Sequence, residues 1–281
     1  MKVGTKQIAG LACGSEGDAE RMGQIHDVYP NRLVVLLLLK LTLAPALVAA
    51  ASVVERRFGH RVAGWTAGFP IVAGPVLFFL AHEQGHTFTS IAAKQTLLGL
   101  VSLSAYCVAY GWISRRAAPM PTLLLSYIAF AAGTLLMSKA ALSLLPALLT
   151  AALSLTLGRL LLPQPAAATG PTPRPSLWVR MIATAAIVLT VTGLAHILGP
   201  RWSGLLVPFP IASTVLVVAA HGAAGSDGAL RVLRGLLPGL YGFALFCASV
   251  SHWLPAHGLL IAFAIGIAAS LVSQTLALRL R

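Results

Sequence analysis

The sequence predicts an all-α, polytopic membrane protein of about nine transmembrane helices, built as two inverted four-helix repeats whose second helices are broken by proline. Three observations predict this class. Hydrophobic residues make up 57% of the chain and charged residues only 10%, whereas a soluble domain carries about 25% charged residues. The apolar residues form long continuous runs. The chain also resembles itself when it is shifted by 140 residues.

Each apolar run is long enough to cross a hydrocarbon core of roughly 30 Å as a helix. The runs are continuous rather than alternating, which favours helices over a membrane β-barrel. The predicted spans are 33–54, 62–81, 90–112, 120–137, 140–162, 177–198, 202–221, 229–251 and 256–278. Only Ser138 and Lys139 interrupt the fourth and fifth, so these two are expected to form a tight hairpin, and eight or ten spans stay open as alternatives.

Two stretches differ from the spans in composition. Residues 1–32 hold four of the seven acidic residues and precede any apolar run, so we expect a disordered tail rather than a secretory signal. Met22 is an alternative start. The proline-rich stretch 163–176 is expected to be a stiff linker. The predicted organisation is listed here: a tail 1–32, repeat one 33–137, a connecting helix and linker 138–176, and repeat two 177–281.

The internal similarity centres on two related segments, GFPIVAGPVLFFLAHEQG from Gly68 and PFPIASTVLVVAAHGAAG from Pro208. Most of the identical residues are Gly, Pro, Phe, Arg and Cys, which chance favours least in a chain rich in Leu and Ala. They include Gly59, Arg61, Gly64, Phe69, Pro70, Gly85, Gly99 and Cys107, which match Gly199, Arg201, Gly204, Phe209, Pro210, Gly225, Gly239 and Cys247. A duplication in a polytopic membrane protein indicates secondary-transporter architecture.

The basic residues predict the orientation. Arginines accumulate on one side of the nine spans, at 56–61, 115–116, 174, 231–234 and 279–281, whereas the other side carries Lys139, Arg201 and the tail residues. Lys and Arg favour cytoplasmic loops, so we expect a multi-pass protein of the cell inner (plasma) membrane with its N-terminus outside and its C-terminus in the cytoplasm. The span 140–162 lies between the repeats, which makes the second repeat inverted relative to the first.

The broken spans are the predicted binding site for a small molecule or ion. Proline removes a backbone donor and clashes with the preceding turn, and interrupted spans at equivalent positions of inverted halves indicate a site near the membrane midplane. A simple kink is the alternative. The candidate substrate-binding residues around the two breaks are Phe69, Pro70, Gly74, Pro75, Phe209, Pro210 and Thr214.

Basic residues within the spans add a second expectation. Lys40 aligns with Arg180 and Lys94 with Arg234 at the 140-residue shift. Charge inside a membrane is costly and usually faces a cavity, so the two pairs favour an anionic substrate, assisted by the positive ends of helices. The alternative is that these side chains extend to the lipid headgroups.

The segment His82-Glu83-Gln84-Gly85-His86 matches H-E-x-x-H, in which two histidines bind zinc and the glutamate activates water. It resembles the zinc motif of the site-2 intramembrane protease family, which implies a zinc-dependent protease with His82 and His86 as metal ligands. That family adds a distant Asp, for which Asp227 is the candidate, although the rest of the second motif is missing. We therefore expect no metal, and interpret Glu83 as a proton-coupling group with His82 or His221 as its partner.

Around Pro208, the segment from Gly204 to Pro210, followed by an apolar run and His221, resembles the core of GlpM-like small inner-membrane proteins. The chain looks like two such units fused, which implies a multi-pass membrane protein and little about its activity.

Together these features predict a secondary transporter of a small solute, with an anionic substrate and proton coupling as the expected case, and with a zinc-dependent intramembrane protease or a non-transporting scaffold as alternatives. The net charge of +13 resides mainly at helix ends, so we expect a lipid bilayer and a solute as partners rather than nucleic acid. Nucleotide, haem and dinucleotide motifs are absent from the sequence, so no cofactor is expected. The oligomeric state stays open.

Overall fold

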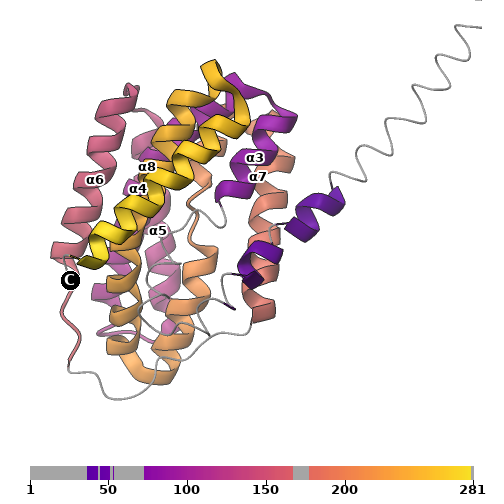
Figure 1. Ribbon diagram of the computed structural model, residues 1–281. Coiled ribbons are helices and arrows are strands. Elements are labelled where there is room, and N and C mark those ends of the chain that lie inside the picture. Colours follow the sequence, from indigo (N-terminus) through magenta and orange to yellow (C-terminus); the bar gives the residue numbers. More distant parts are fainter. Residues whose placement is uncertain (1–36, 44, 51–52, 54–72, 167–176, 280–281) are drawn as a thin grey trace, which may run out of the picture. The chain divides into compact units, whose positions relative to one another are not determined.

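The computed structural model describes residues 37–43, 45–50, 53, 73–166 and 177–279. The chain divides into two units, Met1–Thr42 and Leu43–Arg281, and the following description concerns the second. Its described elements are all helices: α3 (Ala73–Glu83), α4 (His86–Ile113), α5 (Pro119–Ser138), α6 (Leu144–Leu161), α7 (Leu177–Leu206) and α8 (Ile211–Arg279) (Figure 1). Five of these helices are long and apolar enough to cross a membrane.

Helices α7 and α8 are interrupted at glycines. Gly199, with φ of 69°, divides α7 into α7a (177–198) and α7b (200–206). Gly225 and Gly258, with φ of 64° and 76°, divide α8 into α8a (211–223), α8b (226–257) and α8c (259–279). Positive φ values are accessible to glycine at little cost, so these residues determine where the chain changes direction.

Most helix boundaries repeat at the same 140-residue spacing as the sequence, although α4 ends at Ile113 whereas α8b continues past the equivalent position to 257. Helix α3 corresponds to residues 213–223 of α8a, α4 to 226–253 of α8b, and α5 to 259–278 of α8c. The turn before α4 is at Gly85, with φ of 87°, and its counterpart is Gly225. Helix α6 lies between the two sets, as expected for the span 140–162.

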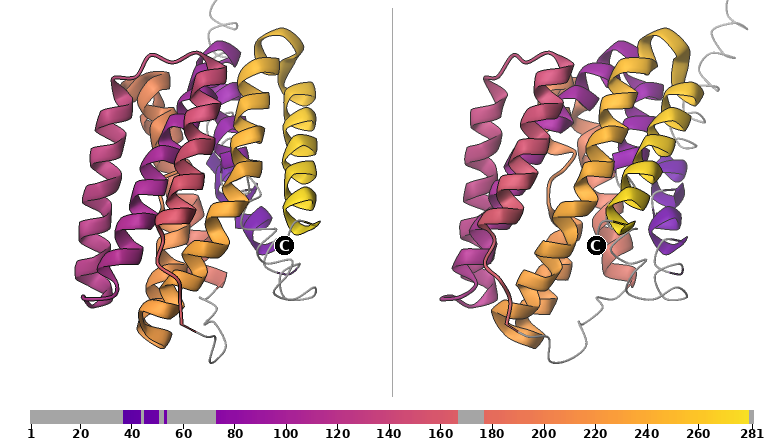
Figure 2. Two further views of the ribbon diagram at one scale, coloured as in Figure 1. Left: turned by 90° about the vertical axis from the view of Figure 1, so that its left-hand side faces the viewer. Right: turned by 60° about the vertical axis from the view of Figure 1, so that its left-hand side comes forward.

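Helices α4 and α8b pack in opposite directions (Figure 2). Near the start of α4, the hydroxyl of Ser90 donates a hydrogen bond of 2.7 Å to the carbonyl oxygen of Ser251. Near its end, a Cβ on Gly111 would lie 3.2 Å from a methyl group of Leu230. At the 140-residue shift, Ser90 is equivalent to Leu230 and Gly111 is equivalent to Ser251. The Ser90–Ser251 contact is therefore the equivalent of the Gly111–Leu230 contact, and the shift exchanges one for the other.

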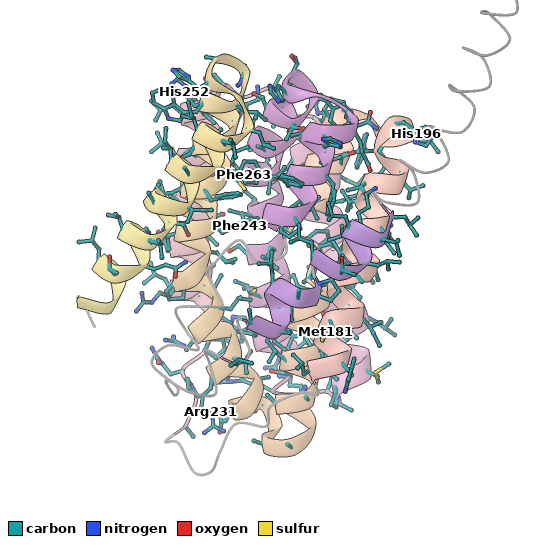
Figure 3. All side chains as sticks on the ribbon, turned by 45° about the vertical axis from the view of Figure 1, so that its right-hand side comes forward. Met181, His196, Arg231, Phe243, His252 and Phe263 are labelled. Carbon is teal, nitrogen blue, oxygen red and sulfur yellow. The ribbon has the colours of Figure 1, made fainter. Side chains whose placement is uncertain are left out.

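Most arginines and most histidines of the described residues lie at opposite ends of this unit. The arginine end carries Arg115, Arg116, Arg231 and Arg234, and the histidine end carries His82, His86, His196, His252 and His257. Figure 3 shows Arg231 at one end and His196 and His252 at the other. The Arg115 guanidinium donates to the Gln164 carbonyl at 3.0 Å, which places the ends of α4 and α6 together. At the other end, Arg201 donates to the Ala140 carbonyl at 2.9 Å.

Helix α4 forms the centre of the unit and contacts α3, α5, α6, α7 and α8. Its buried side chains include Tyr106 and Tyr110, which are fully enclosed. Helices α5 and α6 instead expose rows of leucines, among them Leu124, Leu135, Leu149 and Leu153. Large exposed apolar faces are suited to a lipid environment. The unit therefore has a closely packed centre on α4 and an apolar surface on α5 and α6.

Candidate functional site

The predicted break in the span 202–221 is present. Helix α7b ends at Leu206, α8a begins at Ile211, and Val207–Pro210 between them is not helical. Pro208 and Pro210 have no N–H to continue the helix. The amides of Phe209 and Ile211 form short local hydrogen bonds of 3.0 and 2.9 Å to the carbonyls of Leu206 and Phe209. This break is the first component of the candidate site.

The break lies level with the middle of α4. A Cβ on Gly99 would lie 2.6 Å from Cγ of Pro208 and 2.7 Å from the carbonyl oxygen of Leu205. A Cβ on Gly204 would overlap the carbonyl oxygen of Ala92, and the Thr96 hydroxyl bonds to the Gly204 carbonyl at 3.1 Å. Gly99 and Gly204 are both identical to their repeat counterparts, and the absence of a side chain lets the two segments cross closely.

Three hydroxyl groups meet at the start of α8a. The Thr214 hydroxyl shares hydrogen bonds of 2.9 Å with Tyr106 and 3.0 Å with Tyr127. We call Tyr106, Tyr127 and Thr214 the hydroxyl triad. Three hydroxyls carry three protons, and the two bonds between them use two. One hydroxyl proton of the three is therefore available to an additional acceptor.

Aromatic rings enclose the triad. The Phe209 ring stacks on Tyr127, with centroids 5.4 Å apart and planes at 15°, and Phe130 meets Phe209 edge-on at 5.1 Å. Tyr106 and Tyr127 are 5.7 Å apart between centroids. Phe209 thus joins α5 to the break, as a residue of the repeated Phe-Pro-Ile element. Hydroxyl donors beside ring faces are suited to binding a small molecule through a few directed hydrogen bonds.

A second polar pair lies beside the triad, toward the arginine end. Tyr110 follows Tyr106 by one turn of α4, with ring centroids 6.0 Å apart. Its hydroxyl lies 3.2 Å from Nδ1 of His221, two turns after Thr214 on α8a. The His221 side chain is buried, with 7% of its surface exposed. The polar groups therefore run along facing sides of α4 and α8a from the break toward one end.

The polar groups of the site have no polar equivalents at the 140-residue shift. The repeat counterparts of Tyr106, Tyr127, Thr214, Tyr110 and His221 are Phe246, Ile267, Gly74, Val250 and Ala81. Every polar group in the set has an apolar counterpart. Any ligand of these hydroxyls would therefore bind between the break Val207–Pro210 and the helices α4 and α5.

The first break falls largely outside the described residues, which include neither Phe69 nor Pro70. Gly74 and Pro75 are described, and they lie in the first turn of α3. Proline is tolerated there because the first amides of a helix have no intrahelical partner. Of the predicted site residues, the structure thus brings Phe209, Pro210 and Thr214 together at one place.

The predicted basic residues do not form one group among the described residues. The Arg234 guanidinium donates hydrogen bonds of 2.8 and 3.0 Å to the carbonyls of Leu162 and Pro163, so it holds the chain just after α6. Lys94 is half-buried on α4. Lys40 belongs to the unit Met1–Thr42, and the Arg180 side chain lies outside the described part of the structure.

The H-E-x-x-H segment is divided between two helices. Helix α3 ends at Glu83 and α4 begins at His86, with Gly85 in the left-handed region between them. The zinc motif requires both histidines on one helix face. His82 and His86 are exposed, and the described residues include no group of three His, Cys, Asp or Glu that could hold a metal ion.

Glu83 and His221, predicted as possible partners in proton coupling, lie at opposite ends of α4. Glu83 precedes the start of α4, whereas His221 contacts Tyr110 near its end. Tyr110 follows His86 by 24 positions, which corresponds to about 36 Å of helix. His82 adjoins Glu83, so of the two suggested partners only His82 is a neighbour in the chain.

Sequence reasoning missed the three tyrosines of the site. Tyr106 and Tyr110 lie within the predicted span 90–112, one helical turn apart, and are not among the predicted site residues. Comparing the repeats could have singled them out, because the second copy replaces them with Phe246 and Val250. No protein-family model, curated protein or solved structure matches the chain.

Proposed function

We propose that the protein is a secondary membrane transporter of a small solute, which binds to the hydroxyl triad at the break Val207–Pro210. The observation that carries this proposal is the hydroxyl triad, in which Tyr106 and Thr214 are buried and Tyr127 is half-buried, with one proton unused, against a helix break level with the middle of α4. A buried donor without a partner costs about 1–3 kcal/mol, so an accepting solute gains by pairing with it.

The proposal includes two inverted repeats and nine spans. It is supported by the repeated helix boundaries, by the equivalent glycines Gly85 and Gly225, and by the exchange of the Ser90–Ser251 and Gly111–Leu230 contacts. A two-fold axis perpendicular to two antiparallel helices exchanges equivalent contacts between them in this way. Such an axis in the membrane plane relates the halves of many transporters.

The orientation in this proposal follows from the two ends. Arginine-rich loops favour the cytoplasm, so the arginine end faces inward. Helix α8c runs from Gly258, at the histidine end, to Arg279. The C-terminus is then cytoplasmic and, with nine spans in the plasma membrane, the N-terminus is outside.

The substrate in this proposal is a solute that accepts hydrogen bonds. The triad offers a proton, and Thr214 lies in the first turn of α8a, whose positive end favours negative charge. Both features favour an anion over a cation. The surrounding rings limit the solute to a small size.

The proposal is tested by thermal shift on the purified full chain in detergent. The probes are nitrate, phosphate, small carboxylates and small neutral amides. A solute at 100 times its Kd stabilises the native state by about 2.7 kcal/mol. We expect stabilisation by at least one of the anions, and its loss in Tyr106→Phe and in Thr214→Val.

The matched control is Phe246→Tyr, which adds a hydroxyl at the equivalent place in the other half. We expect it to keep the full stabilisation by the same solute. A solute that stabilises the double variant Tyr106→Phe/Thr214→Val as strongly as the parent would place its binding elsewhere and refute the site.

A further inference from the structure

His221 differs from the other described histidines in its surroundings. It is buried against α4, whereas His82, His86, His196, His252 and His257 are exposed. Imidazole is the side chain whose ordinary titration falls between about pH 5 and 8. His221 is therefore the histidine of the described part of the chain that can place a new charge inside the helical unit.

The bond between His221 and Tyr110 can reverse direction. When the neutral ring carries its proton on Nε2, Nδ1 accepts the Tyr110 hydroxyl proton across 3.2 Å. When the ring takes up a second proton, Nδ1 becomes a donor and the Tyr110 oxygen becomes the acceptor. The Tyr110 proton must then turn to another acceptor, and the adjacent ring on α4 is Tyr106, a member of the triad.

We propose that His221 is the coupling group of the transporter, and that a proton taken up at His221 turns the Tyr110 hydroxyl from His221 toward the triad, which links protonation of His221 to solute binding. The inference rests on the proposed function. One proton enters from water and binds His221 Nδ1, and no bond to carbon forms or breaks. Because coupling is reciprocal, bound solute raises proton affinity by the same factor as the proton raises solute affinity.

The charged groups near His221, at the arginine end, bond to partners other than His221 or lie on segments other than α8a. The His221 ring contacts Tyr110 and the backbone of Ser114. Asp227 on α8b accepts a bond from the Ala166 amide, and Arg115 and Arg234 bond to carbonyls that follow α6. Arg116 follows Arg115 in the turn after α4, and Arg231 lies on α8b. No carboxylate contacts the ring in the described structure, so protonation adds a net positive charge beside the solute site.

The test uses ¹⁹F NMR of the full chain labelled with 3-fluorotyrosine, without any solute. The chain has five tyrosines, so single Tyr→Phe variants assign each signal. Between about pH 5 and 8 we expect the signals of Tyr110, Tyr106 and Tyr127 to shift with one common midpoint. The shifts should be lost in His221→Gln and retained in the control His252→Gln, which alters an exposed histidine.

Three outcomes would overturn the proposal: no shift of Tyr110 in the parent, a shift of Tyr110 alone without Tyr106 and Tyr127, or unchanged shifts in His221→Gln. None of these depends on knowing the solute. The proposed function fails separately, through the thermal-shift test on Tyr106→Phe and Thr214→Val. A protein that binds solute at the triad without linked tyrosine shifts would be a transporter uncoupled from His221.

Discussion

Gly99 lies directly against Pro208, so that a Cβ on Gly99 would come within 2.6 Å of the proline ring. This approach fixes the break at the level of the middle of α4 and brings Tyr106, two turns further along, to Thr214. The position of the hydroxyl triad therefore depends on a residue that has no side chain.

We expect Gly99→Ala to lower the free energy of unfolding by about 1–3 kcal/mol, the usual cost of overpacking a closely packed site. The matched control is Gly235→Ala on α8b, where an added Cβ meets nothing within 4 Å. Replacing this helical glycine should stabilise by up to about 1 kcal/mol. Chemical denaturation in detergent measures the free energy of unfolding of both variants. Equal effects of the two substitutions would contradict the close crossing.

Arg234 provides a test between an anchoring role and an anion-binding role. Its two bonds to the Leu162 and Pro163 carbonyls hold the chain after α6. We expect Arg234→Met to destabilise by about 1.5–3 kcal/mol, because bonds from charged donors contribute that much. The control is Arg159→Met, at an exposed position of α6. If unfolding is unchanged while solute binding in the thermal-shift assay is lost, the sequence-based expectation of an anion ligand is correct instead.

We expect the purified protein to contain no stoichiometric zinc, because the Gly85 turn separates His82 and His86 onto two helices. Elemental analysis by mass spectrometry gives the zinc content per chain. About one zinc per chain that disappears in His86→Ala, but persists in His252→Ala, would restore the intramembrane protease as the leading interpretation.

The apolar runs predicted the helices well where the sequence changes sharply at their ends. The runs 120–137 and 177–198 correspond closely to α5 and α7a. The start of α6 was misplaced, because residues 140–143 are apolar enough to extend the run but form the turn before Leu144. Amino-acid composition indicates which residues can lie in lipid, whereas the position of the turn is determined by the local backbone conformation.

The site was predictable only in part. Pro208 and Pro210 predict a break in the helix because proline lacks a backbone N–H donor. Phe209 and Thr214 are predicted as site residues because they lie close to this break in the sequence. The partners of Thr214 come from α4 and α5, and a linear pattern does not reveal which faces of three helices meet. The split of H-E-x-x-H has a signal in the sequence, since Gly85 matches Gly225 and both turn the chain.

The antiparallel arrangement of the two halves is the central claim, and equivalent positions test it directly. Arg116 and Ala256 are related by the 140-residue shift, and both are exposed: Arg116 lies in the turn after α4, and Ala256 lies in the last turn of α8b. In a Cys13→Ser background, where Cys107 and Cys247 are buried, each position is replaced by cysteine. Intact cells are then treated with a membrane-impermeant maleimide, before and after permeabilisation. The account predicts that Ala256→Cys is labelled in intact cells and Arg116→Cys only after permeabilisation, and labelling of both from the same side would contradict it.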